Sequence, residues 1–100
     1  MIKNISNSPR APIDLEAHIL HSEKPLEIVH LKLRPGESIG LHKNPFDVIF
    51  YVIEGNGTLT VEDTVVEMKS GDTTKIDSSK LRSWINDSKA DLRLLVIKLL

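Results

Sequence analysis

The chain contains no cysteine among its 100 residues. Without thiols it can form neither disulfides nor a cysteine-ligated zinc site, and it has no thiolate nucleophile. An excess of one charge is also missing, because 13 basic and 14 acidic residues are interspersed to a formal net charge of −1. With no basic stripe and no polybasic run, we expect neither nucleic acid nor a membrane surface as a partner.

Long hydrophobic runs are absent as well. No stretch approaches the roughly 18 apolar residues of a membrane span, and the N-terminal sequence MIKNISNSPRAP has no apolar signal-peptide core. These features favour a reduced, cytoplasmic setting. The length predicts a single domain with one hydrophobic core. We assign residues 13–100 to that domain and residues 1–12 to a polar arm, either disordered or exchanged with a partner subunit.

What the chain does contain is a series of short β-type runs separated by turn residues. Ile13–Leu20 alternates between apolar and polar positions, whereas Asp47–Ile53 is almost continuously apolar. Thr58–Val61 and Thr64–Met68 flank Glu62-Asp63, which indicates a two-residue hairpin. About eight or nine such runs follow one another, and this spacing predicts an all-β sandwich or barrel.

The last run, Leu92–Leu100, is apolar on both of its faces. A strand of a lone small barrel normally shows one face to water. Something must therefore cover the second face, either another sheet of the same chain or a partner subunit. The second alternative predicts a homodimer.

One segment resembles a known family. The stretch Pro35–Gly57, PGESIGLHKNPFDVIFYVIEGNG, is similar to the first signature of the cupins, which are small antiparallel jelly-roll barrels also described as double-stranded β-helices. Gly36, His42 and Gly55 match that signature. Asn44 stands at the place of its second histidine, and Val48 at the place of its glutamate.

The second cupin signature is matched only in part. Gly71 and Asn86 fit its frame, and Arg82 occupies its histidine place. Asp77 and Ser79 stand where that signature has proline and glycine. The resemblance covers roughly Leu26 to Leu100 and implies that the all-β domain is a cupin barrel.

The resemblance also implies where a metal site would lie. A cupin site has three histidines and one carboxylate, and the matching positions here are His42, Asn44, Val48 and Arg82. Only the imidazole is a good ligand for a transition metal, and a guanidinium repels a divalent cation. We therefore expect a degenerate metal site and no cofactor. His18, His21 and His30 are expected to be strand histidines rather than replacement ligands.

The altered site can still bind a small molecule. Strand alternation puts Arg82 and Trp84 on one face, and the resemblance implies that they point into the barrel with His42. An arginine fork suits a carboxylate or phosphate. We predict a metal-free pocket for a small anionic ligand, in a binding or sensing module. The predicted ligand-binding residues are His42, Asn44, Val48, Phe50, Arg82 and Trp84.

Other readings remain open at this stage. Arg82 could pair with Asp47, Asp77 or Glu37 and bind nothing. The protein could be a metal-independent enzyme, resembling sugar epimerases, in which His42 and Asp47 perform acid–base chemistry. A metal-dependent enzyme with rearranged ligands is the third alternative, and it needs ligands that the matching positions mostly lack. The sequence leaves the question of catalysis open and leans towards a protein that is not an enzyme.

Overall fold

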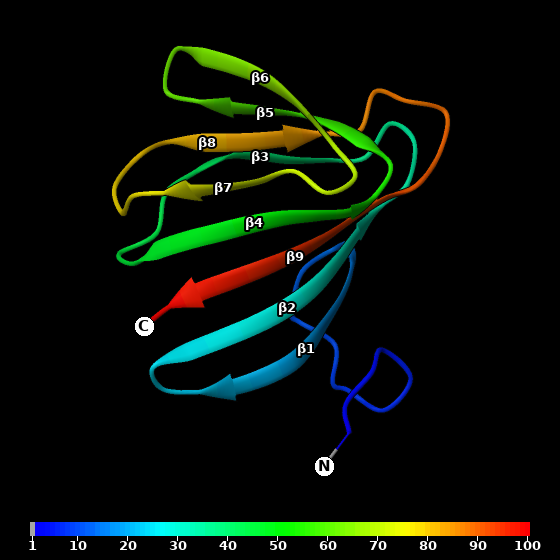
Figure 1. The fold of residues 1–100 in the computed structure, drawn as a ribbon, viewed down its shortest axis with the longest axis vertical. Helices are drawn as coiled ribbons and strands as arrows, with labels where there is room; N and C mark the ends of the chain where they lie inside the picture. Colours follow the sequence, from blue (N-terminus) through cyan, green and yellow to red (C-terminus); the bar gives the residue numbers. More distant parts are fainter. Residues whose placement is uncertain (1) are drawn as a thin grey trace.

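A computed structural model of the protein describes residues 2–100. In this part of the chain the regular structure consists of nine strands, and every strand pair is antiparallel (Figure 1). Residues 2–100 contain no helix that could span a membrane. The strands are β1 (Glu16–Glu23), β2 (Leu26–Leu33), β3 (Ser38–His42), β4 (Asp47–Glu54), β5 (Asn56–Val61), β6 (Thr64–Lys69), β7 (Thr73–Ile76), β8 (Arg82–Ile85) and β9 (Leu92–Leu99).

The strands form two sheets that pack face to face. One sheet has the order β1-β2-β9-β4-β7, and the other has the order β3-β8-β5-β6. Phe50 on β4 meets Trp84 on β8 across the interior, edge to face, with ring centroids 5.4 Å apart. The predicted all-β antiparallel barrel is confirmed.

Alternation of side chains along β4 and β9 decides what enters the core. On β4, Val48, Phe50 and Val52 are buried, and the residues between them face outwards. On β9, Leu92 and Leu94 are completely buried. Both strands are almost continuously apolar, so each also has a second set of apolar side chains, which faces outwards.

Strand boundaries differ from the predicted ones mainly at the first strand. The sequence predicts a strand over Ile13–Leu20, but β1 begins at Glu16 and runs to Glu23. Ile13 is instead part of a tight turn, because its N–H donates to the carbonyl of Ala11 at 2.9 Å. Pairing with β2 extends the strand at its other end, where a bulge between Ile19 and His21 interrupts the alternation.

The hairpin predicted at Glu62-Asp63 is confirmed. Val61 pairs with Thr64, so Glu62 and Asp63 alone form the turn between β5 and β6. Glu62 has a φ of 52°, in the left-handed region that two-residue hairpin turns use.

The segment before β1 lies against β1 of the same chain (Figure 1). Arg10 forms a β-bridge with His18. The N–H of Ile19 donates to the carbonyl of Pro9 at 2.8 Å, and the N–H of Ala11 donates to the carbonyl of Ala17 at 2.9 Å. These main-chain bonds hold the end of the arm along the edge of the larger sheet.

The outer face of the five-stranded sheet carries a row of apolar side chains. Ile28, Ile97 and Ile49 are register partners across β2, β9 and β4, and in the next row Leu95 is paired with Tyr51. The smaller sheet covers only the inner face of β9, so these side chains are half-buried or exposed. A partner subunit on this face, the predicted homodimer, stays a prediction.

Gly55 is expected to tolerate no side chain. Its φ is +86°, and a Cβ there would collide with the main-chain carbonyl of Asp91. We expect Gly55→Ala to lower the free energy of unfolding by about 3 kcal/mol or more, from backbone strain and the collision together. The measurement is urea denaturation. Gly36→Ala is the control, because φ is also +86° there and no described atom lies within 4 Å of the added Cβ. Equal losses in the two variants would contradict the role of the Asp91 contact.

Tyr51→Glu tests the homodimer. Tyr51 is 39% exposed, so a lone subunit accommodates the charge, whereas a sheet-to-sheet interface would bury it without a partner. We expect a dimer in sedimentation velocity for the wild type, a monomer for Tyr51→Glu, and similar circular dichroism for both. Val65→Glu, at a 63% exposed position on β6, should remain dimeric. A wild-type protein that is monomeric throughout the micromolar range would refute the prediction.

Candidate functional site

A cavity of about 450 Å³ lies between the two sheets. Four strands of the larger sheet, two of the smaller sheet and the arm before β1 contribute to its walls. Most of the lining is apolar, and the polar exceptions are few, which is the usual composition of a small-molecule site. The lining residues are Ala11, Pro12, Ile13, Ile19, Glu27, Val29, Leu31, Ile39, His42, Asn44, Val48, Phe50, Trp84, Val96 and Lys98.

Five of the six predicted ligand-binding residues line this cavity: His42, Asn44, Val48, Phe50 and Trp84. Val48, Phe50 and Trp84 reach it from inward positions of β4 and β8, whereas His42 ends β3 and Asn44 lies in the loop that follows. Their role in binding a ligand stays a prediction. The sixth residue, Arg82, is completely buried on the inward face of β8, but it is not among the residues that line the cavity.

The polar lining residues gather towards one end of the cavity. His42 is the last residue of β3, and a short loop joins it to Val48 on β4. Val48 is in turn the register partner of Lys98 on β9, which pairs with Glu27 on β2. Phe50 lies deeper, two residues further along β4. The cavity therefore has a polar end and an apolar interior.

His42 is oriented by its own strand. Its Nδ1 lies 2.9 Å from the carbonyl oxygen of Gly40. A carbonyl accepts only, so Nδ1 carries a hydrogen, and in the neutral ring Nε2 is the acceptor.

Glu27 and Lys98 are site residues that the sequence reasoning missed. Lys98 Nζ lies 3.0 Å from Glu27 Oε2, and Ser22 Oγ donates to Glu27 Oε1 at 2.8 Å. Burial acts to raise the pKa of Glu27, but the hydrogen bonds from Lys98 and Ser22 outweigh it and lower that pKa. The signal was present in the alternation, because Glu27 shares its strand face with Val29 and Lys98 shares its face with Val96.

Arg82 is buried without a hydrogen-bonding acceptor suited to it. It begins β8 between His42 and Val61, its register partners on β3 and β5. Nη1 lies 3.5 Å from the carbonyl of Lys80, at the limit of a hydrogen bond, and Nε and Nη2 have no partner within residues 2–100. Desolvation lowers the pKa of Arg82 because burial disfavours its charged form.

Asn86, the other buried polar residue of the described chain, shows how such a group is normally satisfied. Its Nδ2 donates to the carbonyls of Leu33 and Ala90, both at 2.8 Å, and its Oδ1 accepts from the Ser88 N–H at 3.0 Å. Arg82 has no comparable set of partners. Trp84 Nε1, on the same inward face of β8, is also buried, and no acceptor for it lies within residues 2–100. The interior thus offers several donors that lack acceptors.

Asp47 does not reach His42. Its carboxylate accepts from the Ser78 N–H at 2.7 Å and lies 3.4 Å from Lys75 Nζ. The hydrogen bond from Ser78, with a further contribution from Lys75, lowers the pKa of Asp47. The structure therefore does not form the His42–Asp47 acid–base pair, because strand alternation turns the carboxylate away from the cavity.

The three carboxylates that the sequence offered as partners for Arg82 do not pair with it. No ion pair within residues 2–100 joins Arg82 to Asp47, Asp77 or Glu37. The Glu37 carboxylate instead accepts from the N–H of Arg34.

The remaining histidines lie away from the cavity. His18 and His30 are register partners on β1 and β2, and His21 is exposed. His18 Nε2 lies 3.9 Å from Glu16 Oε2. Burial, together with the positive charge of Arg93 and the neighbouring His18, lowers the pKa of His30. None of the three belongs to the cavity lining of the described chain.

The side chains at this site do not fit the metal set that the cupin resemblance implies. The cavity wall holds one imidazole, His42, and one carboxylate, Glu27, which is tied to Lys98. Throughout residues 2–100, no three histidine or carboxylate side chains converge as metal ligands would. The guanidinium of Arg82 at the remaining position disfavours a divalent cation.

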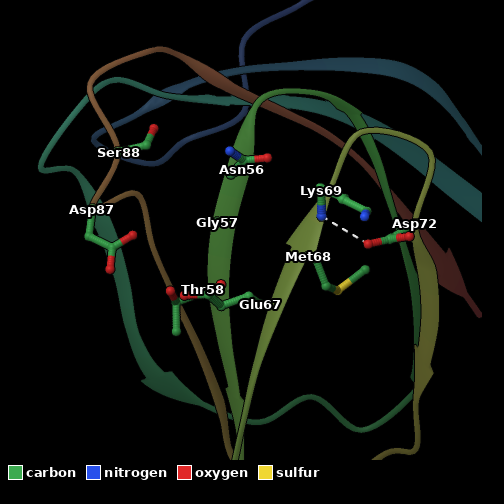
Figure 2. Close-up of a pocket in the computed structure, with 9 residues that line it drawn as sticks. All are labelled: Asn56, Gly57, Thr58, Glu67, Met68, Lys69, Asp72, Asp87 and Ser88. Atoms are coloured by element: carbon green, nitrogen blue, oxygen red, sulfur yellow. Dashed lines mark hydrogen bonds between the residues drawn. The ribbon is translucent and has the colours of Figure 1, made fainter.

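A second pocket, of about 560 Å³, lies at the opposite ends of β5 and β8 from Arg82 (Figure 2). Its carboxylates are spread out, with Asp72 and Asp87 on different sides in Figure 2. Asp72 Oδ2 accepts from the Lys69 N–H at 2.9 Å. In the described chain, none of the buried unpaired polar atoms belongs to its lining residues. We therefore place the candidate site in the first cavity.

The comparisons with known proteins assign the chain to a family. The model of the cupin domain matches residues 29–98, so this chain belongs to the cupins. The resemblance drawn from the stretch Pro35–Gly57 is confirmed.

Relatives of this chain include proteins of similar and of much greater length. It is 33% identical to an oxalate-binding protein of Thermotoga maritima, over 98% of this chain and 86% of that protein. A solved structure of a predicted oxalate decarboxylase from Thermotoga maritima has a TM-score of 0.89 and 27% identity, covering 100% of this chain and 99% of that one. A 1-hydroxy-2-naphthoate 1,2-dioxygenase of Nocardioides sp. is 33% identical over 64% of this chain, which is 16% of the dioxygenase.

Arg82→Met is expected to stabilise the ligand-free protein. Methionine keeps much of the side-chain volume and removes a buried charge that lacks an acceptor, so we expect a gain of about 1–2 kcal/mol, or roughly 5–10 °C in Tm. The measurement is differential scanning calorimetry. Arg34→Met is the control, because Arg34 is largely exposed and should change little. A fall in Tm for Arg82→Met would show that the guanidinium has a structural role.

Proposed function

We propose that this protein is a small-molecule-binding cupin whose cavity takes a carboxylate ligand without a metal ion. The observation that carries the proposal is the burial of Arg82 beside the cavity with two nitrogens that lack an acceptor. Such a charge is costly in the empty protein, and an anionic ligand would compensate it. A carboxylate matches the planar fork of donors that arginine presents.

The neighbours of Arg82 support an anion site. His42 is its register partner on β3 and lines the cavity, as does Trp84 on the same strand. The Trp84 indole donor is unpaired within residues 2–100, and a carboxylate oxygen could accept its hydrogen bond. In this proposal the Arg82 side chain leaves its weak contact with the Lys80 carbonyl and turns towards the cavity when the ligand enters.

The names of two relatives agree with an acidic ligand. One relative is named for binding oxalate and another for acting on 1-hydroxy-2-naphthoate, and both compounds are carboxylates. The shared cupin fold and the cavity inside it make the same class of ligand reasonable for this chain. The dioxygenase is a much longer protein, so its reaction is not carried over.

Binding is better supported than catalysis. A metal-independent acid–base enzyme needs a second titratable group beside His42. Asp47 is held outside the cavity by Ser78 and Lys75, and the one carboxylate in the lining, Glu27, is engaged by Lys98 and Ser22. We therefore propose a binding or sensing module.

Isothermal titration calorimetry with a panel of carboxylates tests this function. The panel contains acetate, oxalate and 3-phenylpropionate, each titrated near neutral pH with and without a chelator. We expect binding of at least one acid that is unaffected by the chelator. Arg82→Met should weaken it by about 100-fold or more, because loss of a charge-assisted contact in a buried site costs several kcal/mol.

Arg34→Met is the matched control for this experiment. It also removes one guanidinium, but Arg34 pairs with Glu16 outside the cavity, so the affinity should stay within about twofold. An unchanged affinity in Arg82→Met would overturn the proposal, and so would binding that disappears when the chelator is added.

A further inference from the structure

The shape and lining of the cavity narrow the class of ligand. We infer that the ligand is an amphipathic carboxylate, with its acid group at the polar end and an aromatic or branched apolar body in the interior. This inference rests on the proposed function and deepens it. It separates the expected ligand from oxalate, the compound for which one relative is named.

The first argument is size. The cavity measures about 450 Å³, and one water molecule takes roughly 30 Å³ of the liquid, so the space corresponds to about fifteen waters. Oxalate is two joined carboxylate groups and would leave most of this space to solvent. A ligand with a ring and a short side chain fills a cavity of this size far better.

The second argument is the character of the walls. A water molecule in an enclosed site needs about two to four polar partners. The interior walls, formed by side chains such as Leu31, Ile39, Phe50 and Val96, offer none from their side chains. Solvent beside them gains little, and an apolar group that displaces it is favoured in proportion to the area buried.

The third argument is the position of the charges. The buried Arg82 and the polar residues His42, Glu27 and Lys98 all belong to strand ends that meet at the same end of the cavity, as the register of β3 with β8, of β2 with β9 and of β4 with β9 requires. Lys98 is paired with Glu27 there, so Arg82 is the charge at this end that lacks a counter-ion. Deeper inside, the edge-to-face pair of Phe50 and Trp84 presents aromatic surface. A ligand with one acidic head and one apolar body matches this polarity, whereas a compound with charge at both ends would bury one charge among apolar groups.

Calorimetry with three probes tests the inference on the wild-type protein. The probes are oxalate, 3-phenylpropionate and the neutral 3-phenylpropionamide. We expect 3-phenylpropionate to bind about 30-fold or more tightly than oxalate, because burial of a phenyl group contributes a few kcal/mol. The amide should bind at least about tenfold more weakly than its acid, because it lacks the charge that meets Arg82.

A wall substitution provides the matched variant. Val96→Thr keeps the side-chain volume and puts a hydroxyl on the apolar wall. We expect it to weaken 3-phenylpropionate by about five- to tenfold and to leave oxalate unchanged. Val65→Thr makes the same change at an exposed position of β6 and should alter neither affinity.

The outcomes separate this inference from the proposed function. Oxalate binding as tightly as 3-phenylpropionate, or a loss of oxalate affinity in Val96→Thr, overturns the amphipathic ligand and leaves a carboxylate-binding protein. An amide that binds as tightly as its acid overturns the carboxylate site and leaves an apolar one. Failure of both acids to bind at millimolar concentration overturns both proposals.

Discussion

The packing of Trp84 between the two sheets is the contact on which the architecture depends. Its ring meets Phe50 edge to face, and it also lies close to Gly57 on β5. A Cβ at Gly57 would lie 2.5 Å from Leu92 Cδ2 and 3.1 Å from Trp84 Cζ3. The Leu92 side chain and the Trp84 ring together leave little room for a side chain at Gly57 on the neighbouring strand β5. The same tryptophan closes the solid core at one end and forms a wall of the cavity at the other.

Replacement of the cupin metal ligands changes the physical character of the interior. A metal site would concentrate neutral imidazoles and a carboxylate around one cation, whereas this interior places a fixed positive charge at the Arg82 position. That charge is not neutralised by Asp47, Asp77 or Glu37 within residues 2–100. A buried cation without a counter-ion destabilises a protein. In the function proposed above, the ligand brings the negative charge, and stability and binding are then linked through this one side chain.

Local pattern predicted much of the fold for identifiable reasons. The turn at Glu62-Asp63 and the inward set of β4 follow from two-residue periodicity and turn chemistry, which act over a few residues. The cupin signature placed five of the six predicted ligand-binding residues on the cavity wall, since it records the spacing of inward positions. The first strand was misplaced because its limits depend on pairing with β2 and on the bulge at His21. Glu27 was missed because its importance comes from Lys98, distant in the sequence but adjacent in the sheet.

The sequence by itself determined the all-β class, the family and the exchange of donor residues at the site, because each of these is written in residue identity and short-range spacing. Only the tertiary structure decided which charges are compensated. Lys98 meets a carboxylate and Asp47 turns outwards, while Arg82 is enclosed without a counter-ion. Charge pairing depends on side chains from strands that are far apart in the chain, and no spacing rule reports the burial that gives each pair its strength.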